Sequence, residues 1–322
     1  MNPKLFLADI LAKPAALTAL ADTLEREPPF SAVPREARRV LFLGMGSSRY
    51  AALVAAQRLR AAGIDAVAEY ASARLGYPPA GDMLVVVISA SGESVETLDA
   101  LGRYRGVCPV VALTNSPASR LAHEADVVVP LHAGTEAGGV ACRTFQHTGL
   151  LLQALVEHLT GVPANVPELC RRVAAASADL LDRRADWLDE TVALLDGPHG
   201  VYFLAPAERF SSAAQSALMI REGPRRAADA CETGDWAHVD VYLTKTLDYR
   251  AVLFPGSAYD GQAMQWMTAR RSTVVTVGGE VPGATRAVRF LGDDDPDVAL
   301  HTETLVAELV AAAWWEQAEP SS

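Results

Sequence analysis

The sequence predicts an α/β fold in which each half of the chain forms a parallel sheet with helices on both of its faces. Two observations carry this prediction. Short β-type apolar runs alternate with segments that are long enough for crossover helices. The alternation stops at a proline-containing segment, TGVPANVP (160–167), and then begins again. At 322 residues and 50% hydrophobic side chains, the chain is long enough for two such domains, each with its own core.

The expected elements begin with an N-terminal helical arm. Apolar residues between Leu5 and Leu24 recur with a helical period, which Pro14 interrupts. The segment RRVLFLG (38–44) is typical of a strand that ends in a glycine loop, and a helix is expected from Tyr50 to Ala62. Four further strands are expected in the first half, at 65–69, 83–89, 109–113 and 126–129, followed by a helix at 146–159.

A long helical stretch, 168–196, opens the second half. The strand–loop–helix order then recurs, which indicates an internal duplication with low sequence identity between the halves. The expected strands are 200–206, 250–257 and 272–279, and the expected helices are 211–222, 260–269 and 298–317. The sequence thus predicts an N-terminal arm (1–37), a first domain (38–163) and a second domain (164–322).

Charge and composition narrow the classes of partner. The net charge of −11 argues against a nucleic-acid or membrane-surface partner, because either usually requires a basic patch. No uncharged apolar run reaches 18 residues, and the N-terminus carries Asp9 within its apolar section and lacks a cleavage site, so we expect a cytoplasmic protein. The histidines show no metal-ligand spacing, and we expect neither a metal nor another cofactor. Buried free thiols are expected at the four widely spaced cysteines, Cys108, Cys142, Cys170 and Cys231.

Two Ser/Gly-rich segments follow predicted strands of the first half. GMGSS (44–48) follows the strand at 38–43, and SASGES (89–94) follows the strand at 83–88. In a parallel sheet, such loops present backbone N–H groups, hydroxyls and a helix N-terminus to the same edge. Neither segment is a Walker A loop or a complete dinucleotide fingerprint. One such loop is as often an ordinary helix cap, but two at adjacent strand ends favour a phosphate site.

These loops form part of a wider resemblance. LGMGSSRYAA, ISASGESVETLDAL and ALTNSPASRLAHEADVVVPLHAGTEAGGVACRTF together resemble the sugar isomerase (SIS) domain family. The likeness is specifically to the isomerase part of glucosamine-6-phosphate synthase and to stand-alone phosphosugar isomerases, deaminases and deglycases. It is strong in the first half of the chain and looser in the second. The resemblance implies two SIS subdomains, each a three-layer α/β/α, flavodoxin-like unit.

The resemblance also implies which residues of the first half bind substrate. The segment AGTEAGGVACRTF (133–145) corresponds to the loop that closes over the sugar in the family, and Ala90 stands where the synthase pattern has a glutamine. The implied phosphate ligands are Ser48, Ser89, Ser91 and Ser94. The implied residues of the substrate loops are Gly46, Ser47, Glu136, Gly139, Val140 and Ala141.

In the second half, the resemblance implies two catalytic residues. Glu222 matches the acid–base glutamate that moves a proton between C1 and C2, and His238 matches a histidine associated with ring opening. In the family that histidine reaches into the partner subunit's site, which implies a homodimer or a dimer of dimers. The chemistry suits these residue types. A carboxylate can move the proton between adjacent carbons through an enediol, and ring opening needs a group that titrates near neutrality. Without the resemblance, Glu222 is more typical of a solvent-facing helix end, and His238 is more typical of an ordinary loop histidine.

The second half also departs from the family pattern. Met219 stands where the synthase-like pattern has a lysine, and Gln215 replaces a glutamate. The segment GDWAHVD keeps only Gly234 and His238 of the family's version, and Lys245 is the one lysine near this loop. The sequence also has no counterpart of the synthase's lysine-bearing C-terminal tail or of its glutaminase domain. We therefore expect no glutamine-dependent synthesis.

Two functions remain open at the level of sequence. The first is a phosphosugar-binding enzyme that isomerises a hexose or amino-hexose 6-phosphate between aldose and ketose, with or without loss of an amine or deglycation. The alternative is a non-catalytic sugar-phosphate sensor, because the half that carries the catalytic residues departs most from the family. The acidic segment GDDDPD (292–297) is expected to cap the last helix, since it lacks the ligand spacing of a calcium loop.

Overall fold

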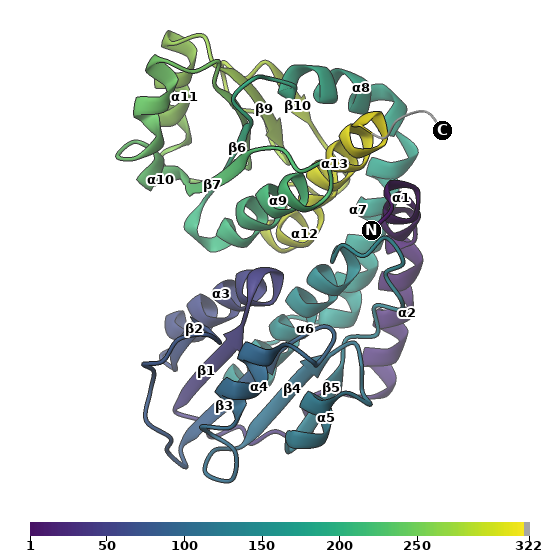
Figure 1. Ribbon diagram of the computed structural model, residues 1–322, viewed down its shortest axis with the longest axis vertical. Coiled ribbons are helices and arrows are strands. Elements are labelled where there is room, and N and C mark those ends of the chain that lie inside the picture. Colours follow the sequence, from purple (N-terminus) through teal and green to yellow (C-terminus); the bar gives the residue numbers. More distant parts are fainter. Residues whose placement is uncertain (319–322) are drawn as a thin grey trace. The chain divides into compact units, whose positions relative to one another are not determined.

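The first half of the chain forms a five-stranded parallel sheet. The computed structural model describes residues 1–318, and Figure 1 shows this sheet in the purple and blue part of the chain. The strand order is β2-β1-β3-β4-β5, and every neighbouring pair is parallel. The strands are β1 (Arg39–Gly44), β2 (Asp65–Tyr70), β3 (Met83–Ile88), β4 (Val110–Thr114) and β5 (Val127–Pro130).

The second half forms a separate parallel sheet with the same strand order. Its order is β10-β9-β8-β6-β7. Read from β7, and with β6 counted as the first strand, this is the same 2-1-3-4-5 order as in the first sheet. The strands are β6 (Val201–Ala205), β7 (Ala228–Glu232), β8 (Arg250–Leu253), β9 (Thr273–Val277) and β10 (Arg286–Val288). This shared topology is what a duplicated unit would produce.

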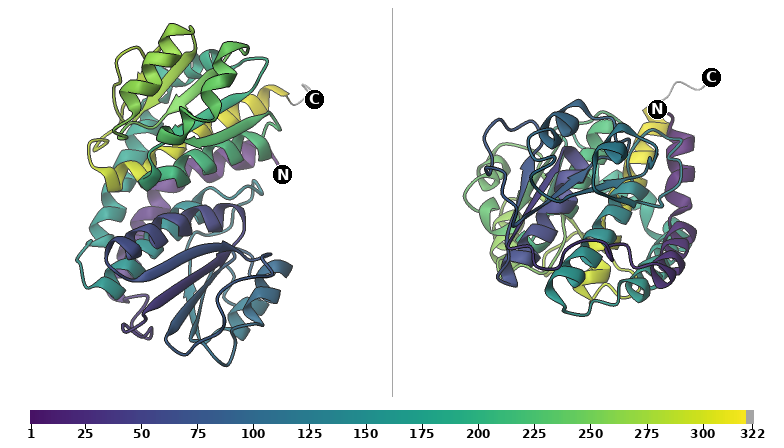
Figure 2. Two further views of the ribbon diagram at one scale, coloured as in Figure 1. Left: turned by 90° about the vertical axis from the view of Figure 1, so that its left-hand side faces the viewer. Right: turned by 90° about the horizontal axis from the view of Figure 1, so that it is seen from below.

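Helices cover both faces of each sheet (Figure 2). On one face of the first sheet, Leu41 and Val85 form a core with Leu101 of the covering helix α4. Phe42 and Val86 are buried on the other face, because successive strand residues alternate in direction. The helices of the first half are α3 (Gly46–Ala61), α4 (Val95–Leu101), α5 (Arg120–Glu124) and α6 (Arg143–Thr160). The fold class predicted from the sequence is therefore confirmed.

The second sheet is covered in the same way. One face carries a core of Leu204, Trp236 and Met264, and α9 and α8 contact the sheet at β6 and β9. The helical elements are α7 (Val166–Asp182), α8 (Arg184–Leu195), η1 (Ala207–Arg209), α9 (Phe210–Glu222), α10 (Thr233–Trp236), η2 (Asp240–Lys245), α11 (Asp260–Ala269), α12 (Pro296–Thr302) and α13 (Thr304–Ala318).

Two strands of the second sheet were not predicted from the sequence. The edge strand β7 has the sequence ADACE, with no β-branched or aromatic residue, and the edge strand β10 has three residues. Edge strands bury fewer side chains and so show a weaker apolar pattern. The long helical stretch expected at 168–196 consists of two helices, α7 and α8, with a break at Arg183.

The chain divides into two compact units whose limits differ from the predicted ones. One unit comprises residues 16–135 and 143–171, and the other comprises 1–15, 136–142 and 172–322, of which 319–322 lie outside the described residues. The residues of the predicted arm are shared between these two units. Its first helix, α1 (Pro3–Leu11), belongs with the second sheet, because it packs on α13; the remainder, from α2 (Lys13–Arg26) onward, belongs mostly with the first sheet.

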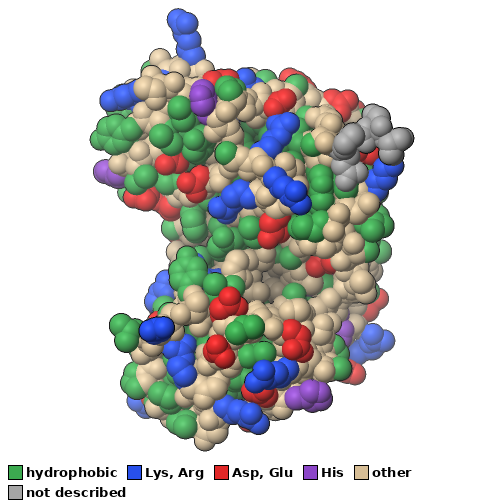
Figure 3. All heavy atoms as spheres, viewed as in Figure 1, with side chains coloured by type: hydrophobic (Ala, Val, Ile, Leu, Met, Phe, Trp, Pro, Cys, Tyr) green, Lys and Arg blue, Asp and Glu red, His purple; other side chains and the backbone are tan. Residues whose placement is uncertain are grey.

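Two simpler expectations, on the cysteines and on the acidic segment 292–297, are met in the structure. The four cysteines are free and buried. The last helix, expected at 298–317, is divided into α12 and α13, and the acidic segment caps the first of them: the Asp295 side chain accepts hydrogen bonds from the backbone N–H groups of Asp297 and Val298. Lys and Arg side chains are interspersed with Asp and Glu on the face shown in Figure 3. Among residues 1–318, no helix combines the length and apolarity needed to cross a membrane.

Candidate functional site

The Ser/Gly-rich loops lie at the topological switch point of the first sheet. β1 and β3 are neighbours, and the chain passes from β1 to β2 on one side and from β3 to β4 on the other. Ligands of open α/β sheets bind at such a point, outside the carboxyl ends of the strands. Ser48 follows β1, and Ser89, Ser91 and Ser94 follow β3. The topology thus brings the four predicted phosphate ligands to one edge of one sheet.

The first turn of α3 at this edge presents backbone N–H groups without a side-chain cap. Its N-cap residue is Met45, whose side chain makes no capping hydrogen bond. By contrast, α1 and α5 are capped by the side chains of Asn2 and Ser119. The first N–H groups of a helix need an acceptor from outside the helix, and the 16-residue α3 adds the positive end of its dipole. This helix start therefore suits an anion.

The hydroxyl groups of the second loop are oriented by the loop itself. Ser89 is buried, and its Oγ accepts a hydrogen bond from Gly92 N at 3.1 Å. The exposed Ser91 accepts one from Glu93 N at 3.3 Å, and Ser94 accepts one from Thr97 Oγ1 at 3.1 Å. Because each oxygen already accepts a hydrogen bond, the hydroxyl proton is left to be donated to an anion.

The glycine and the glutamate of SASGES fix the shape of this loop. Gly92 has φ +68°, and a Cβ there would lie 2.0 Å from Ser119 Oγ, so only glycine fits. Glu93 Oε1 accepts a hydrogen bond from Arg120 N at 2.8 Å, in the first turn of α5. The loop is thereby held against α5, which preorganises the three serines.

Two further residues of this unit were not singled out from the sequence. Asn115 follows β4 and holds the start of the AGTE segment, since its Oδ1 accepts from Ala133 N at 3.1 Å and its Nδ2 donates to Gly134 O at 2.7 Å. Arg49 lies in the first turn of α3 with its guanidinium 3.9 Å from the centre of the Tyr70 ring. Both residues stand within quoted motifs, but their roles depend on contacts across the sheet.

The predicted substrate loop, 133–145, is divided between the two units: its central residues, 136–142, belong to the unit of the second sheet and form contacts at both ends. Glu136 Oε1 accepts a hydrogen bond from Cys142 N at 2.7 Å, which closes the loop on itself. Gln215 of α9 donates through Nε2 to Ala141 O at 2.9 Å. Gly139 adopts φ +77° and is exposed, whereas Val140 is buried. The structure therefore brings this loop together with the helix that carries Glu222.

Along α9, the positions that depart from the family pattern share one helical face with Glu222. Gln215, Met219 and Glu222 are spaced by four and three residues, which places them on one side of a helix. Gln215 Nε2 lies 3.6 Å from Met219 Sδ, and both side chains are fully buried. The two departures therefore fit one another, and Gln215 supplies a donor to Ala141 O that a glutamate could not.

Glu222 is half-buried at the last residue of α9. Burial raises the pKa of its carboxyl, and the neighbouring Arg221 opposes this rise. A carboxyl that titrates closer to neutrality is better suited to moving a proton in both directions.

His238 is exposed on the loop after α10, and its backbone N donates to Asp235 O at 2.8 Å. Lys245 is also exposed and lies 5.2 Å from the centre of the Tyr242 ring. Glu222, His238 and residues 136–142 of the substrate loop thus belong to the unit of the second sheet. The four serines, Gly46 and Ser47 belong to the unit of the first.

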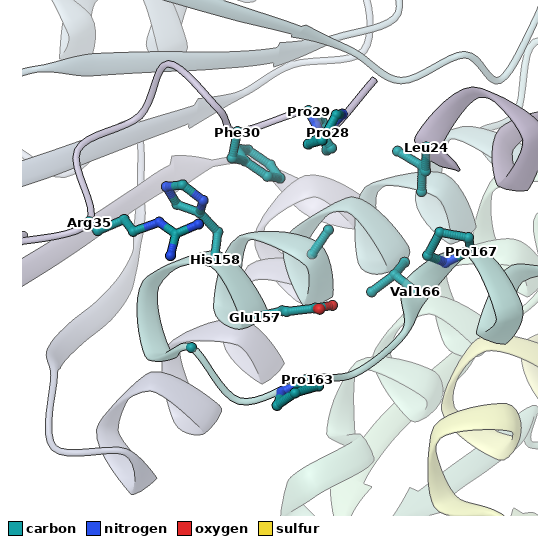
Figure 4. Close-up of a pocket in the computed structure, with 12 residues that line it drawn as sticks. Leu24, Pro28, Pro29, Phe30, Arg35, Glu157, His158, Pro163, Val166 and Pro167 are labelled. Atoms are coloured by element: carbon teal, nitrogen blue, oxygen red, sulfur yellow. The ribbon is translucent and has the colours of Figure 1, made fainter. Parts of the chain in front are cut away.

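A cavity elsewhere in the first unit contains none of the predicted site residues. It measures about 330 Å³ and lies among the segment before β1, the end of α6 and the start of α7. Figure 4 shows Phe30, His158 and Pro163 around it. His158 Nε2 donates to Val33 O at 2.8 Å, which ties α6 to the segment before β1. This cavity lies by the amino end of β1, whereas the serines follow the carboxyl ends of the strands.

Comparisons with known proteins identify the family of the first half of the chain. Residues 35–164 match the family model described as the SIS domain. The chain therefore carries a SIS domain in its first half, and the recognition made from the sequence is confirmed. A curated relative, glutamine–fructose-6-phosphate aminotransferase (isomerizing) of Aeropyrum pernix, is 30% identical over 306 residues, which are 85% of this chain and 47% of that protein. The chain thus spans about half the length of this relative.

Solved structures share the fold over nearly the whole chain. The C-terminal domain of glucosamine-fructose-6-phosphate aminotransferase from Francisella tularensis has a TM-score of 0.81 at 18% identity, covering 97% of this chain and 96% of that one. Tagatose-6-phosphate ketose/aldose isomerase from Escherichia coli has a TM-score of 0.76 at 15% identity, covering 96% and 92%. We expected no glutamine-dependent synthesis from the sequence, and these similarities do not test that expectation.

Proposed function

We propose that the chain is an enzyme that binds a hexose or amino-hexose 6-phosphate and interconverts its aldose and ketose forms. The observation that carries this proposal is the edge of the first sheet, where three oriented serine hydroxyls follow β3 and the uncapped start of α3 follows β1. A phosphate dianion would supply acceptors to these hydroxyls and to the start of α3. The phosphate would be the handle by which the reacting carbons are oriented.

The proton transfer is assigned to Glu222. Its carboxylate would remove the proton from C2 of the open-chain aldose, and the enediol would take the same proton back at C1 while a hydroxyl proton moves between O2 and O1. No electrons or groups leave the substrate, so the step needs no external reactant. The burial that raises the pKa of Glu222 supports this role, because the residue must act as base and then as acid.

The identity of the group at C2 decides how the reaction ends. With a hydroxyl, isomerisation is complete once C1 is protonated. With an amine, the product of the proton shift is an imine at C2, which water hydrolyses to a ketone and ammonia. Both outcomes use the same proton shift at Glu222.

His238 is assigned to ring opening, moving a proton between O1 and the ring oxygen. It is exposed on its own unit, and it would reach a substrate bound by a second copy of the chain. The enzyme is therefore proposed to act as a homodimer or a dimer of dimers, in which each site is completed by the partner.

The panel that tests this proposal consists of fructose 6-phosphate, glucosamine 6-phosphate and a fructosamine 6-phosphate. Turnover is followed by NMR and binding by thermal shift. We expect turnover of at least one substrate, and a loss of 100-fold or more in kcat for Glu222→Gln. Met219→Leu keeps the volume of a buried neighbour on the same helix and is the matched control. If the phosphosugars stabilise the wild-type protein in the thermal-shift assay but none is turned over, catalysis would be contradicted and a sugar-phosphate sensor favoured.

A further inference from the structure

We propose that α1 positions the substrate loop, residues 136–142, and that Asp9 is the positioning residue through which it acts. The proposal rests on the proposed function for the meaning of the loop, but its contacts lie within one compact unit. It assigns a role in sugar recognition to a helix that is more than 120 residues away from the loop in sequence.

Both polar groups of one loop residue, Gly138, are bound by α1 and its cap. Asp9 Oδ2 accepts a hydrogen bond from Gly138 N at 2.7 Å, and the Asp9 side chain is 5% exposed. At the other side of the same residue, Gly138 O accepts a hydrogen bond from Asn2 N at 3.2 Å. A hydrogen bond to a buried carboxylate is among the stronger ones, so this pair fixes the loop at its centre.

The contact at Gly138 is also steric. A Cβ at this position would lie 2.4 Å from Phe6 Cα and 2.6 Å from Phe6 N, which are backbone atoms of the helix. A side chain here would push the loop away from α1. The loop backbone therefore lies directly on the backbone of α1, and glycine is required for that approach.

Two contacts anchor this end of the chain to the body of its unit. Lys13 Nζ lies 2.6 Å from Glu308 Oε2 on α13, and both side chains are fully buried. The Phe6 and Trp315 rings pack with their centres 6.0 Å apart. Because removal of one partner would leave a buried charge, the ion pair holds the N-terminal segment in one position.

The loop is thus supported from two sides. Asp9 and Asn2 hold its centre, and Gln215 holds Ala141 at its end. Of the predicted sugar contacts, Gly139 and Val140 lie between these supports, and Ala141 is held by the second of them. The serines that are proposed to bind phosphate belong to the other unit. Weakening the Asp9 contact is therefore expected to impair recognition of the sugar and leave phosphate binding intact.

The test compares Asp9→Ala with Asp9→Asn, which keeps an acceptor for Gly138 N. Hydrogen exchange of the peptide covering 136–142, in full-length protein without ligand, should be about tenfold faster in Asp9→Ala, and close to wild type in Asp9→Asn. KM for the phosphosugar should rise about tenfold in Asp9→Ala, whereas inhibition by inorganic phosphate should not change. The control is Asp22→Ala, which removes an exposed acid of α2 that pairs with Arg171.

Unchanged exchange and unchanged KM in Asp9→Ala would overturn the proposal, as would an equal loss of affinity for inorganic phosphate. If Asp9→Ala fails to fold, Gly138→Ala makes the same test from the loop side, and should also speed exchange and raise KM. A third outcome separates the two proposals. If the wild type binds no phosphosugar, the proposed function is refuted; if the variants still show faster exchange, the positioning of the loop by α1 stands.

Discussion

Gln215 Nε2 donates a hydrogen bond to Ala141 O at 2.9 Å, which joins the helix of the candidate acid–base residue to the predicted substrate loop. The family pattern has a glutamate at position 215, and a carboxylate cannot donate to a carbonyl oxygen. Met219, which replaces a lysine, contacts the same glutamine. Gln215 and Met219, the two residues of α9 that differ from the family pattern, therefore pack against each other, and Gln215 supports the loop.

Gln215→Glu tests this arrangement directly. The buried carboxylate would face a carbonyl oxygen, so we expect the free energy of unfolding to fall by about 1–3 kcal/mol and KM for the phosphosugar to rise about tenfold. Urea denaturation and steady-state kinetics are the measurements. Gln215→Met removes the donor without adding a charge and should have a smaller effect. Equal behaviour of both variants and the wild type would show that the hydrogen bond does not support the loop.

Gly92→Ala should damage the proposed phosphate site more than an ordinary glycine substitution. Its Cβ would collide with Ser119, whereas Gly63 also has a positive φ, +84°, with nothing within 4 Å of an added Cβ. Gly63→Ala therefore carries the backbone strain alone, roughly 1 kcal/mol. We expect Gly92→Ala to be several-fold more destabilising in thermal denaturation and to lose phosphosugar binding. Comparable effects at the two positions would mean that contact with Ser119 does not fix the loop.

The proposed activity should depend on pH through Glu222. Its base form is required to begin the reaction, and burial raises its pKa from 4.5, so the acidic limb of kcat should lie above pH 4.5. Arg221 lowers this pKa. Arg221→Ala should therefore move the limb to higher pH, and the exposed Arg225, changed to Ala, is the control. A limb that stays in place in Arg221→Ala would argue against Glu222 as the titrating group.

Glu303 should make the stability of the second unit depend on pH. It is fully buried 3.1 Å from Arg209, and burial raises its pKa from 4.5 to about 7. The folded state therefore holds this proton more tightly than the unfolded state. The resulting stability is fully present below pH 4.5 and is lost as the pH rises through about 7.

At about 1.4 kcal/mol per pKa unit, the loss is on the order of 3 kcal/mol. Urea denaturation of the wild type and of Glu303→Gln between pH 4.5 and 8 measures it, since the variant cannot titrate at this position. Parallel pH profiles of the two proteins would rule out the raised pKa of Glu303.

The sequence predicted those features that depend on local pattern. The buried strand β3 is a continuous apolar run, and SASGES follows it directly, so both the sheet and the serine loop could be anticipated. The edge strands β7 and β10 were missed because ADACE and RAV carry little apolar periodicity.

The supports of the substrate loop could not be predicted from local pattern. In the sequence, Asp9 is a charge within an apolar segment and Gly138 is one glycine of a motif. No local pattern indicates that the two are in contact. Their contact depends on how α1 packs, and it joins residues 129 positions apart. In the same way, the helical period of residues 3–26 does not show which of the two units each part of this segment joins.

The measurement that tests the central claim most directly is the affinity for fructose 6-phosphate and for unphosphorylated fructose, by isothermal titration calorimetry. The wild type and Ser89→Ala are compared, with Ser31→Ala, an exposed serine before β1, as the control. We predict that the wild type binds only the phosphorylated sugar, and that Ser89→Ala weakens this binding about tenfold or more while Ser31→Ala does not. Equal affinity for the two sugars, or unchanged affinity in Ser89→Ala, would contradict the assignment of a phosphosugar site to this edge of the sheet.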